Sequence, residues 1–361
     1  MNSKPSISIR LYEEGDDGGI FDLNRAIYPE DQTERSEWIR KWHWQFDDSS
    51  AGKGKIWLAE HGSKIVGQYP LIFTNVKIQT ETLRASQNVD LKVHPAYRHQ
   101  GIFPRLEKRA FSEMEKEGIH ITVGFANELS RLYHIKSGGW FDINTLQVFI
   151  NPLNWENALN LRVGNRLMRK VVAMGAKLLL NGMFYRTENP PFIKGLIVNQ
   201  INSFDERFDE FWIRVSNQYN ILVVRNKEYL NWRYSTPGVT YTIFSAEISG
   251  EVHGYLVMNY KIRNSTKLCN IFDAMACSIE ILHNLVFRAI EVCRQQNVDL
   301  IRYSLIANKA HHQVLRDNGF ILFPVIKGEF FVAHSNLPSI SQDFLKDPDN
   351  WLVQIGDSDS I

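Results

Sequence analysis

A loop rich in hydrogen-bond donors joins a predicted strand to a predicted helix. Its residues are Val93-His94-Pro95-Ala96-Tyr97-Arg98-His99-Gln100-Gly101-Ile102-Phe103-Pro104. Gly101 lets the backbone approach a ligand closely, because glycine has no Cβ, and Pro104 fits the first turn of a helix, where no intrahelical N–H is needed. The free N–H groups of that turn, together with the helix dipole, form an anion site. A pyrophosphate fits such a site, and the side chains of Arg98 and His99 can add donors.

The elements around this loop give it a context. The sequence predicts a strand before the loop, then an amphipathic helix, a buried strand and a short helix after it, over residues 83–93, 103–116, 119–125 and 129–136. Asn127 introduces the short helix, and Gly138-Gly139-Trp140 follows it. A lone Arg-x-x-Gly-x-Phe segment is common where helices begin. The order of the elements, rather than the loop alone, therefore indicates a function.

This series resembles the GNAT acyltransferase superfamily over about residues 6–150. The phosphate-binding signature of that superfamily is Arg/Gln-x-x-Gly-x-Gly/Ala; Arg98 and Gly101 fall on it, and Phe103 departs from its last position. The resemblance implies that main-chain groups of the strand pair with the pantetheine arm of coenzyme A and that the loop holds its pyrophosphate. It implies acetyl-coenzyme A as the cofactor, bound by Leu91, Lys92, Val93, Arg98, His99, Gln100, Gly101, Ile102, Phe103 and Asn127.

The resemblance also implies a catalytic acid. In the superfamily an Asn begins the short helix, and a Tyr further along it protonates the departing thiolate, so Asn127 and Tyr133 are similar to that pair. Counted from Asn127, however, Tyr133 stands one position early, His134 occupies the usual position, and the Gly-Trp pair falls one position late. A one-residue insertion explains both offsets. The alternatives are that His134 is the acid, or that Tyr133 is a core residue with a hydrogen-bonded hydroxyl.

The general base is a separate question, because amine attack on a thioester requires that a proton leave the amine. A carboxylate on the fourth strand serves some members of the superfamily, but Gln87 stands at that place here. Asp90 is the nearest acid on the strand and is the predicted base. Its alternative role is structural, as a carboxylate paired with Lys92 or Arg84. Two further candidates are Glu60 and His94.

The second half of the sequence repeats the element order of the first. A hairpin over 241–262 is followed by a strand, a helix, a buried strand and a last helical segment over 270–276, 280–296, 300–305 and 308–320. This repeat indicates duplication of one domain, but Arg and Gly are missing before the first of these helices, and Leu315 stands in the place of the tyrosine. The second half thus resembles a degenerate GNAT domain. The predicted fold is α/β (α+β), with a mixed, mostly antiparallel sheet flanked by helices, present twice.

Four regions are predicted along the chain. They are a GNAT domain with the coenzyme A loop, a helical linker, a degenerate GNAT-like domain and a C-terminal tail, over 1–150, 151–204, 205–335 and 336–361. Residues 146–150 form the expected last strand of the first domain. The linker contains a basic helical stretch over 155–185, which either packs between the domains or lies on an anionic membrane surface. The tail is polar and acidic, and it either covers a sheet edge or is partly disordered.

Composition limits the classes of partner. A formal net charge of +1 over 361 residues gives no overall field that attracts nucleic acid. The three cysteines, Cys269, Cys277 and Cys293, match no zinc or redox spacing and indicate free thiols in a reducing cytoplasm. No apolar stretch is long enough to insert stably in a membrane. No metal site is expected, because His311 and His312 are neighbours on a predicted helix and face different ways.

These features predict an N-acyltransferase that moves an acyl group, usually acetyl, from acyl-coenzyme A to a small-molecule primary amine. The segment Trp232-Arg233-Tyr234 resembles tandem acyltransferases associated with bacterial surface-polysaccharide synthesis, which implies an amino sugar as the acceptor. Two other hypotheses stay open: an aminoacyl or peptidyl transferase of the cell-wall type, and a coenzyme A-binding protein without catalysis. The sequence leaves the oligomeric state undetermined.

Overall fold

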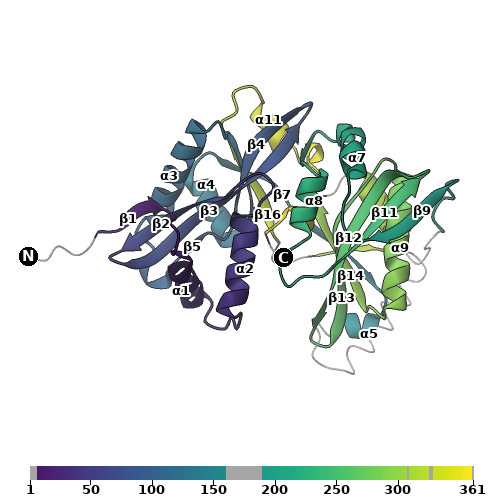
Figure 1. The fold of residues 1–361 in the computed structure, drawn as a ribbon, viewed down its shortest axis with the longest axis horizontal. Helices are drawn as coiled ribbons and strands as arrows, with labels where there is room; N and C mark the ends of the chain where they lie inside the picture. The colour runs from purple at the N-terminus through teal and green to yellow at the C-terminus, as the bar shows by residue number, and fades with distance from the viewer. Residues whose placement is uncertain (1–5, 160–188, 307–308, 325–327, 360–361) are drawn as a thin grey trace, which may run out of the picture.

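The computed structural model describes residues 6–159, 189–306, 309–324 and 328–359. It contains two twisted sheets that lie side by side, each with helices against it (Figure 1). Both sheets are mixed and mostly antiparallel. The predicted fold class is therefore confirmed, with one such sheet in each half of the molecule.

The first sheet has the order β1-β2-β3-β4-β6-β16-β7, and β5 and β10 also pair with β3. Its strands are β1 Ser8–Leu11, β2 Lys55–His61, β3 Lys64–Ile78, β4 Glu81–Asn88, β5 Lys92–Val93, β6 Ile121–Ala126, β7 Trp140–Thr145, β10 Ile221–Val223 and β16 Phe330–Ser335. The helices of this half are α1 Asp17–Ile27, α2 Arg35–Phe46, α3 Ile102–Lys116 and α4 Glu128–Ser137. Helix α3 buries Ile102, Leu106, Ala110 and Met114 at helical spacing against β2 and β3. This packing fixes the direction in which the first turn of α3 points.

The second sheet has the order β15-β8-β14-β13-β12-β11-β9, and β17 also pairs with β14. Its strands are β8 Gln147–Pro152, β9 Leu196–Ile201, β11 Tyr241–Ile248, β12 Glu251–Arg263, β13 Thr266–Ala276, β14 Leu300–Ile306, β15 Ile321–Phe323 and β17 Val353–Gln354. The helices described here are α5 Trp155–Ala158, α7 Arg207–Val215, α8 Lys227–Arg233, α9 Ile279–Gln295, α10 Lys309–Asp317 and α11 Gln342–Lys346. Helix α9 packs on β12 and β13 with the same apolar spacing that α3 shows in the first half.

Two strands are exchanged between the halves. Strand β8 follows β7 directly in sequence but pairs with β14 and β15 of the second sheet. Strand β16, from the second half, lies between β6 and β7 of the first sheet. The expectation that residues 146–150 end the first domain as its last strand is therefore wrong, although a strand does form there. Residues 148–152 are buried on both faces, so their apolar pattern suits an interior place in either sheet and does not specify which.

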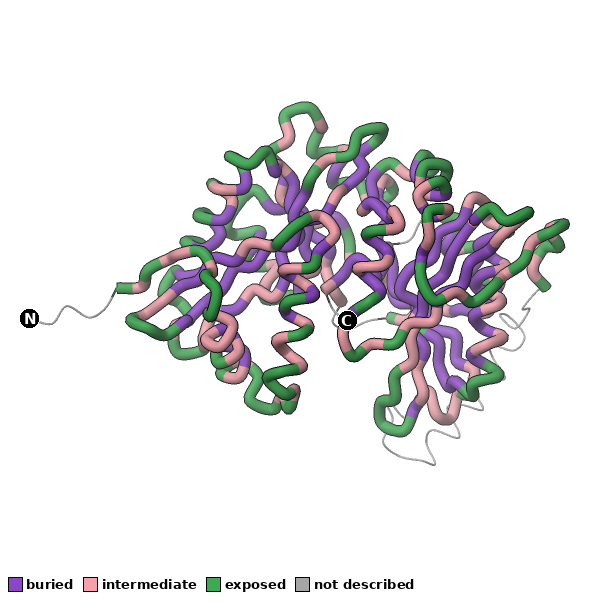
Figure 2. Tube along the Cα trace, viewed as in Figure 1, coloured by how far each residue is buried: buried purple, intermediate pink, exposed green. Residues whose placement is uncertain are grey.

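The C-terminal tail packs between the two sheets. Its side chains Leu345, Trp351, Leu352 and Val353 are buried, and the buried stretches of the chain meet at this junction (Figure 2). Strand β17 pairs with the end of β14. The described part of the tail thus packs in the core, and β17 lies beside β14, which is an inner strand of the second sheet.

Two predicted segments fall outside the described residues. Of the basic helical stretch over 155–185, the structure describes only α5 and residue 159, so neither proposed role for it is decided. Asn308, expected to lead the helix now seen as α10, also lies outside them. Among the helices that the structure does describe, none is long and apolar enough to cross a membrane.

Candidate active site

A cavity of about 350 Å³ opens where the chain passes from β5 into α3. Its lining comes from α1, β5, the 97–101 loop, α3 and the start of α4: Ile27, Tyr28, Leu91, Lys92, Val93, Tyr97, Arg98, His99, Gly101, Ile102, Phe103, Pro104, Asn127, Leu129, Ser130 and Tyr133. Ten of the twelve residues that we predicted for the site are in this set; Asp90 and Gln100 are not. The volume is in the range of small-molecule sites.

One end of the cavity is built to receive an anion. Helix α3 begins at Gly101, whose φ of 69° is a left-handed conformation that glycine adopts without strain. No side chain caps the first turn, so its N–H groups remain available to a ligand. His99, with a φ of 63°, holds the left-handed conformation at an energetic cost. Arg98 and His99 line the cavity on the same loop.

The middle of the cavity is a strand edge. Strand β4 pairs with β6 in parallel through Ser86, Gln87 and Asn88, and the chain then turns at Asp90, whose φ is 52°. Strand β5 pairs on one side with β3. Its other side has no strand partner among the described residues, and Leu91, Lys92 and Val93 line the cavity there. An extended ligand with amide groups can pair with such an edge.

Phe103 occupies the position where the signature has a small residue. Its side chain is buried against Tyr69, Tyr133 and His134, with ring centroids 6.1, 5.8 and 5.6 Å apart. The bulk of the ring therefore lies in the core under the cavity. The departure from the signature changes this packing and leaves the main chain of the first turn of α3 in place.

Tyr133 and His134 lie on different sides of α4. The Tyr133 side chain lines the cavity and is 42% exposed, whereas His134 is 3% exposed. The His134 Nδ1 lies 3.3 Å from Glu107 Oε1, and its ring packs on Trp140 with centroids 4.2 Å apart. The same carboxylate oxygen accepts a 2.9 Å hydrogen bond from Trp140 Nε1. His134 thus belongs to a buried core cluster, and Tyr133 is the one of the two that can reach a ligand.

The predicted bases are engaged elsewhere. The Asp90 carboxylate accepts from Lys92 Nζ at 2.7 Å, which is the structural role that the sequence left open. Glu60 accepts from Arg10 at 2.6 Å, outside the cavity. His94 Nδ1 accepts from the main-chain N–H of Ala96 and so caps the short turn Pro95–Tyr97.

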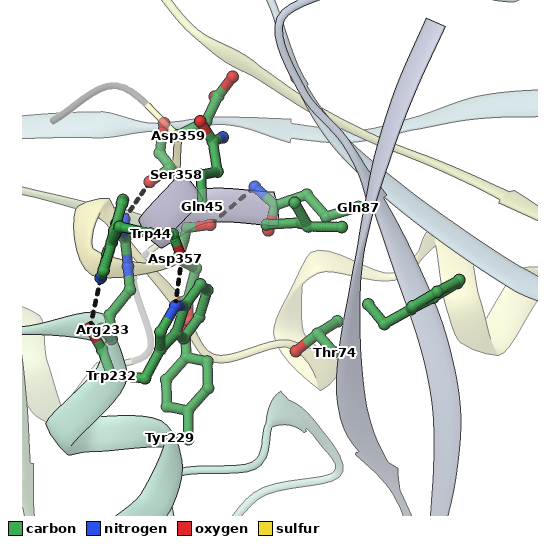
Figure 3. Close-up of a pocket in the computed structure, with 12 residues that line it drawn as sticks. Trp44, Gln45, Thr74, Gln87, Tyr229, Trp232, Arg233, Asp357, Ser358 and Asp359 are labelled. Carbon is green, nitrogen blue, oxygen red and sulfur yellow. Dashed lines mark hydrogen bonds between the residues drawn. The ribbon is translucent and has the colours of Figure 1, made fainter. Parts of the chain in front are cut away.

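A second, smaller cavity of about 40 Å³ lies between the two halves (Figure 3). Aromatic and polar side chains from α2, β3, β4, α8 and the C-terminus line it, among them Trp44, Gln45, Thr74, Gln87, Tyr229, Trp232, Arg233, Asp357, Ser358 and Asp359. The acidic residues of this set are not predicted from the sequence, since they lie in a polar tail without a motif. The only signal for them is the apolar run Trp351-Leu352-Val353, which indicates that the tail is anchored in a core.

The second half differs from the first at the two features that form the coenzyme cavity, namely the gap between the two parallel strands and the first turn of the following helix. Strands β13 and β14 pair in parallel up to Ile271 and Tyr303 and then diverge, as β4 and β6 do. Here β17 fills the gap: it pairs with β14, and Gln354 Oε1 accepts from the Ala274 N–H at 2.9 Å. Helix α9 is capped by Ser278, whose Oγ accepts from the Ile281 N–H. The protein's own chain thus occupies the positions that are open in the first half.

The comparisons with known proteins agree with this geometry. Residues 8–138 match the family described as the acetyltransferase (GNAT) domain. This part of the chain is a GNAT domain. The match includes the Gly101 loop and Tyr133, and it places the domain in a superfamily of N-acyltransferases that use acyl-coenzyme A. No curated protein matches the sequence.

Solved structures share the fold well beyond the GNAT domain. A GCN5-related N-acetyltransferase from Anabaena variabilis ATCC 29413 has a TM-score of 0.64 at 10% identity, over 91% of this chain and 72% of its own. A probable N-acyltransferase of unknown function from Enterococcus faecalis V583 has a TM-score of 0.63 at 10% identity, over 91% of this chain and 73% of its own. Saccharomyces cerevisiae N-myristoyltransferase, solved with myristoyl-CoA, has a TM-score of 0.60 at 13% identity, over 93% of this chain and 80% of its own. These matches show that the two-sheet fold, with both halves, is shared.

Proposed function

We propose that the protein transfers an acyl group from acyl-coenzyme A to a primary amine, with the GNAT domain holding the coenzyme. The observation that carries the proposal is the order of groups along the 350 Å³ cavity. The uncapped first turn of α3 suits a diphosphate, the free edge of β5 suits the amides of pantetheine, and Tyr133 suits the sulfur. Coenzyme A carries these three chemical groups in the same order.

The chemistry needs no covalent enzyme intermediate. The thioester is an activated acyl group, so holding it beside a neutral amine supplies much of the rate. Main-chain N–H groups near the turn at Asp90 can polarise its carbonyl. Tyr133 then gives its phenolic proton to the thiolate as the C–S bond breaks. His134, fixed in the core by Glu107, helps to pack the helix that carries Tyr133.

For the second half we propose a GNAT-like domain that has lost its coenzyme site and forms one wall of the acceptor site. The small cavity between the halves supports this, because α8 of the second half contributes Tyr229, Trp232 and Arg233 to it. We propose acetyl as the acyl group and an amino sugar as the acceptor. Aromatic rings in the lining of a polar site suit a sugar ring, which has both apolar and polar faces.

The test is an assay of free thiol released from acetyl-, hexanoyl- and myristoyl-coenzyme A over a library of amines that includes amino sugars and amino acids. We expect release that depends on both the donor and the amine, with the acylated amine identified by mass spectrometry. Coenzyme A binding without release from any donor would instead make the protein a coenzyme A-binding protein without catalysis.

A further inference from the structure

The last described residues of the chain are held by both halves of the molecule. We refer to residues 354–359 as the C-terminal segment. Gln87 of β4 donates from Nε2 to the main-chain carbonyl of Asp357 at 3.0 Å. Arg233 of α8 donates from Nε to the carbonyl of Gly356 at 2.5 Å and from Nη2 to that of Ser358. Figure 3 shows Gln87 and Arg233 reaching the segment from opposite sides.

A buried network of ion pairs also holds the C-terminal segment in place. Arg225 is fully buried and donates from Nη2 to both carboxylate oxygens of Asp357 at 2.8 Å. Its Nε donates to Asp273, whose Oδ2 also accepts from the hydroxyls of Tyr234 and Tyr255 at 3.0 and 2.9 Å. Removing one partner from such a network strands a buried charge, so the network strongly favours one position of the segment.

This anchoring places the Asp359 carboxylate beside the turn that divides β4 from β5. Asp359 lines the small cavity between the halves, and the main chain of Asp90 supplies its carboxylate with a hydrogen bond. Asp90 is followed directly by Leu91, which lines the coenzyme cavity. The Asp90 carboxylate is paired with Lys92, and within the described chain Asp359 has no ion-pair partner. Asp359 is therefore a carboxylate without an ion pair among the residues described, hydrogen-bonded to the main chain of the residue that precedes Leu91 of the coenzyme cavity.

We propose that Asp359 is the general base of the acyl transfer, which rests on the function proposed above. The amine nitrogen forms a bond to the thioester carbonyl carbon, and the C–S bond breaks. A proton of the amine goes to the Asp359 carboxylate, and the phenolic proton of Tyr133 goes to the thiolate. The products are the amide and free coenzyme A, so atoms and charges balance once Asp359 returns its proton through water to Tyr133. The C-terminal segment thereby completes a site that the GNAT domain forms only in part.

The surroundings of Asp359 suit this role. Burial raises its pKa to about 6, and the negative charges of Asp90 and Glu329 add to the effect, while hydrogen bonds from the main chain oppose it. The other charged groups near it are Asp357, which is held by Arg225, and Arg233, which holds the carbonyl of Ser358. A base with a pKa slightly below neutrality is ionised at working pH and still accepts a proton effectively.

The experiment compares Asp359→Asn with Asp349→Asn, an exposed acid of the same tail, using acetyl-coenzyme A and the library amine that the wild-type enzyme acetylates fastest. We expect Asp359→Asn to lose about a hundredfold or more in kcat/KM and to keep its coenzyme A affinity and its melting temperature. Asp349→Asn should match the wild type. If the wild type is active and Asp359→Asn keeps full turnover, the assignment of Asp359 as the base is overturned and the proposed function is not. An inactive wild type overturns the proposed function and the assignment with it.

The pH profile separates Asp359 from Asp90. The wild-type kcat/KM should rise with pH through an apparent pKa near 6 as the base ionises, and Asp359→Asn should lack this rise. Asp90→Asn removes a negative charge that raises the pKa of Asp359, so its rise should move to lower pH but persist. Loss of the rise in Asp90→Asn, with its retention in Asp359→Asn, would make Asp90 the base.

Discussion

Trp44 and Trp232 stack with ring centroids 5.4 Å apart, and each indole N–H donates a 2.9 Å hydrogen bond to the main-chain carbonyl of the other. The two residues are 188 positions apart in the sequence and join α2 of the GNAT domain to α8 of the second half. Both also line the small cavity that contains Asp359. The pair therefore couples the stability of the junction to the geometry of the acceptor side of the site.

Trp232→Phe should weaken this junction. Phenylalanine keeps a stacking ring but cannot donate, so the carbonyl of Trp44 loses its partner, and we expect the free energy of unfolding to fall by about 1–3 kcal/mol. Urea denaturation measures the change. Trp38→Phe is the control, because Trp38 lies on α2 together with Trp44 but packs on Phe21 of α1. Equal losses in the two variants would show that the reciprocal hydrogen bonds contribute nothing specific.

Tyr133→Phe should lower turnover by more than about tenfold and leave coenzyme A affinity nearly unchanged, since the ring stays and only the proton is lost. His134→Ala should instead lower stability, because it opens a space beside the buried Glu107 and Trp140. Steady-state kinetics and thermal melts of both variants check this. If Tyr133→Phe keeps full turnover while a folded His134→Ala loses it, the catalytic acid is His134.

The second half should lose stability in acid through His311. This side chain is buried on α10, and desolvation lowers its pKa to about 4. Between that value and the unfolded pKa of about 6.5 the unfolded chain binds more protons, so stability falls as pH drops. From pH 7 to pH 5 the loss from this group is about 2 kcal/mol. Urea unfolding at both pH values should show a smaller loss in His311→Gln than in the wild type; equal losses would contradict the argument.

The local part of the site could be predicted from the sequence. The strand, the glycine loop and the helix that begins at Gly101 are set by neighbouring residues, and the structure places the loop, Asn127 and Tyr133 around one cavity. Asp90 was also correctly seen as a possible partner of Lys92. These features depend on contacts between residues close in sequence, which is why their pattern is readable.

The remainder depends on contacts across the whole chain. Strands β8 and β16 have patterns that suit either sheet, so their exchange cannot be read from apolar spacing. The place of Asp359 depends on Arg225, Arg233 and Gln87, which lie more than a hundred residues away and show no shared spacing. The apolar pattern of a segment predicts its secondary structure and its burial, but it does not predict which distant segment it packs against.

Coenzyme A should bind at one site per chain. In the second half, β17 fills the gap between β13 and β14, and Ser278 caps the first turn of α9. A ligand there would have to displace Gln354 from its hydrogen bonds to Asp273 and Ala274. Isothermal titration of the full chain gives the stoichiometry. Two equivalent sites per chain would contradict the account of the second half.

Calorimetric titration of Gly101→Glu tests most directly whether the first turn of α3 holds the diphosphate of coenzyme A. Gly118→Glu is the matched control: both glycines have left-handed φ values, 69° and 75°, and open space where a Cβ would stand, so both substitutions bring the same backbone strain. A carboxylate at position 101 would repel the diphosphate. We predict that coenzyme A binds the wild type and Gly118→Glu alike and binds Gly101→Glu more than about a hundredfold more weakly. Unchanged affinity in a folded Gly101→Glu variant would contradict this role of the first turn of α3.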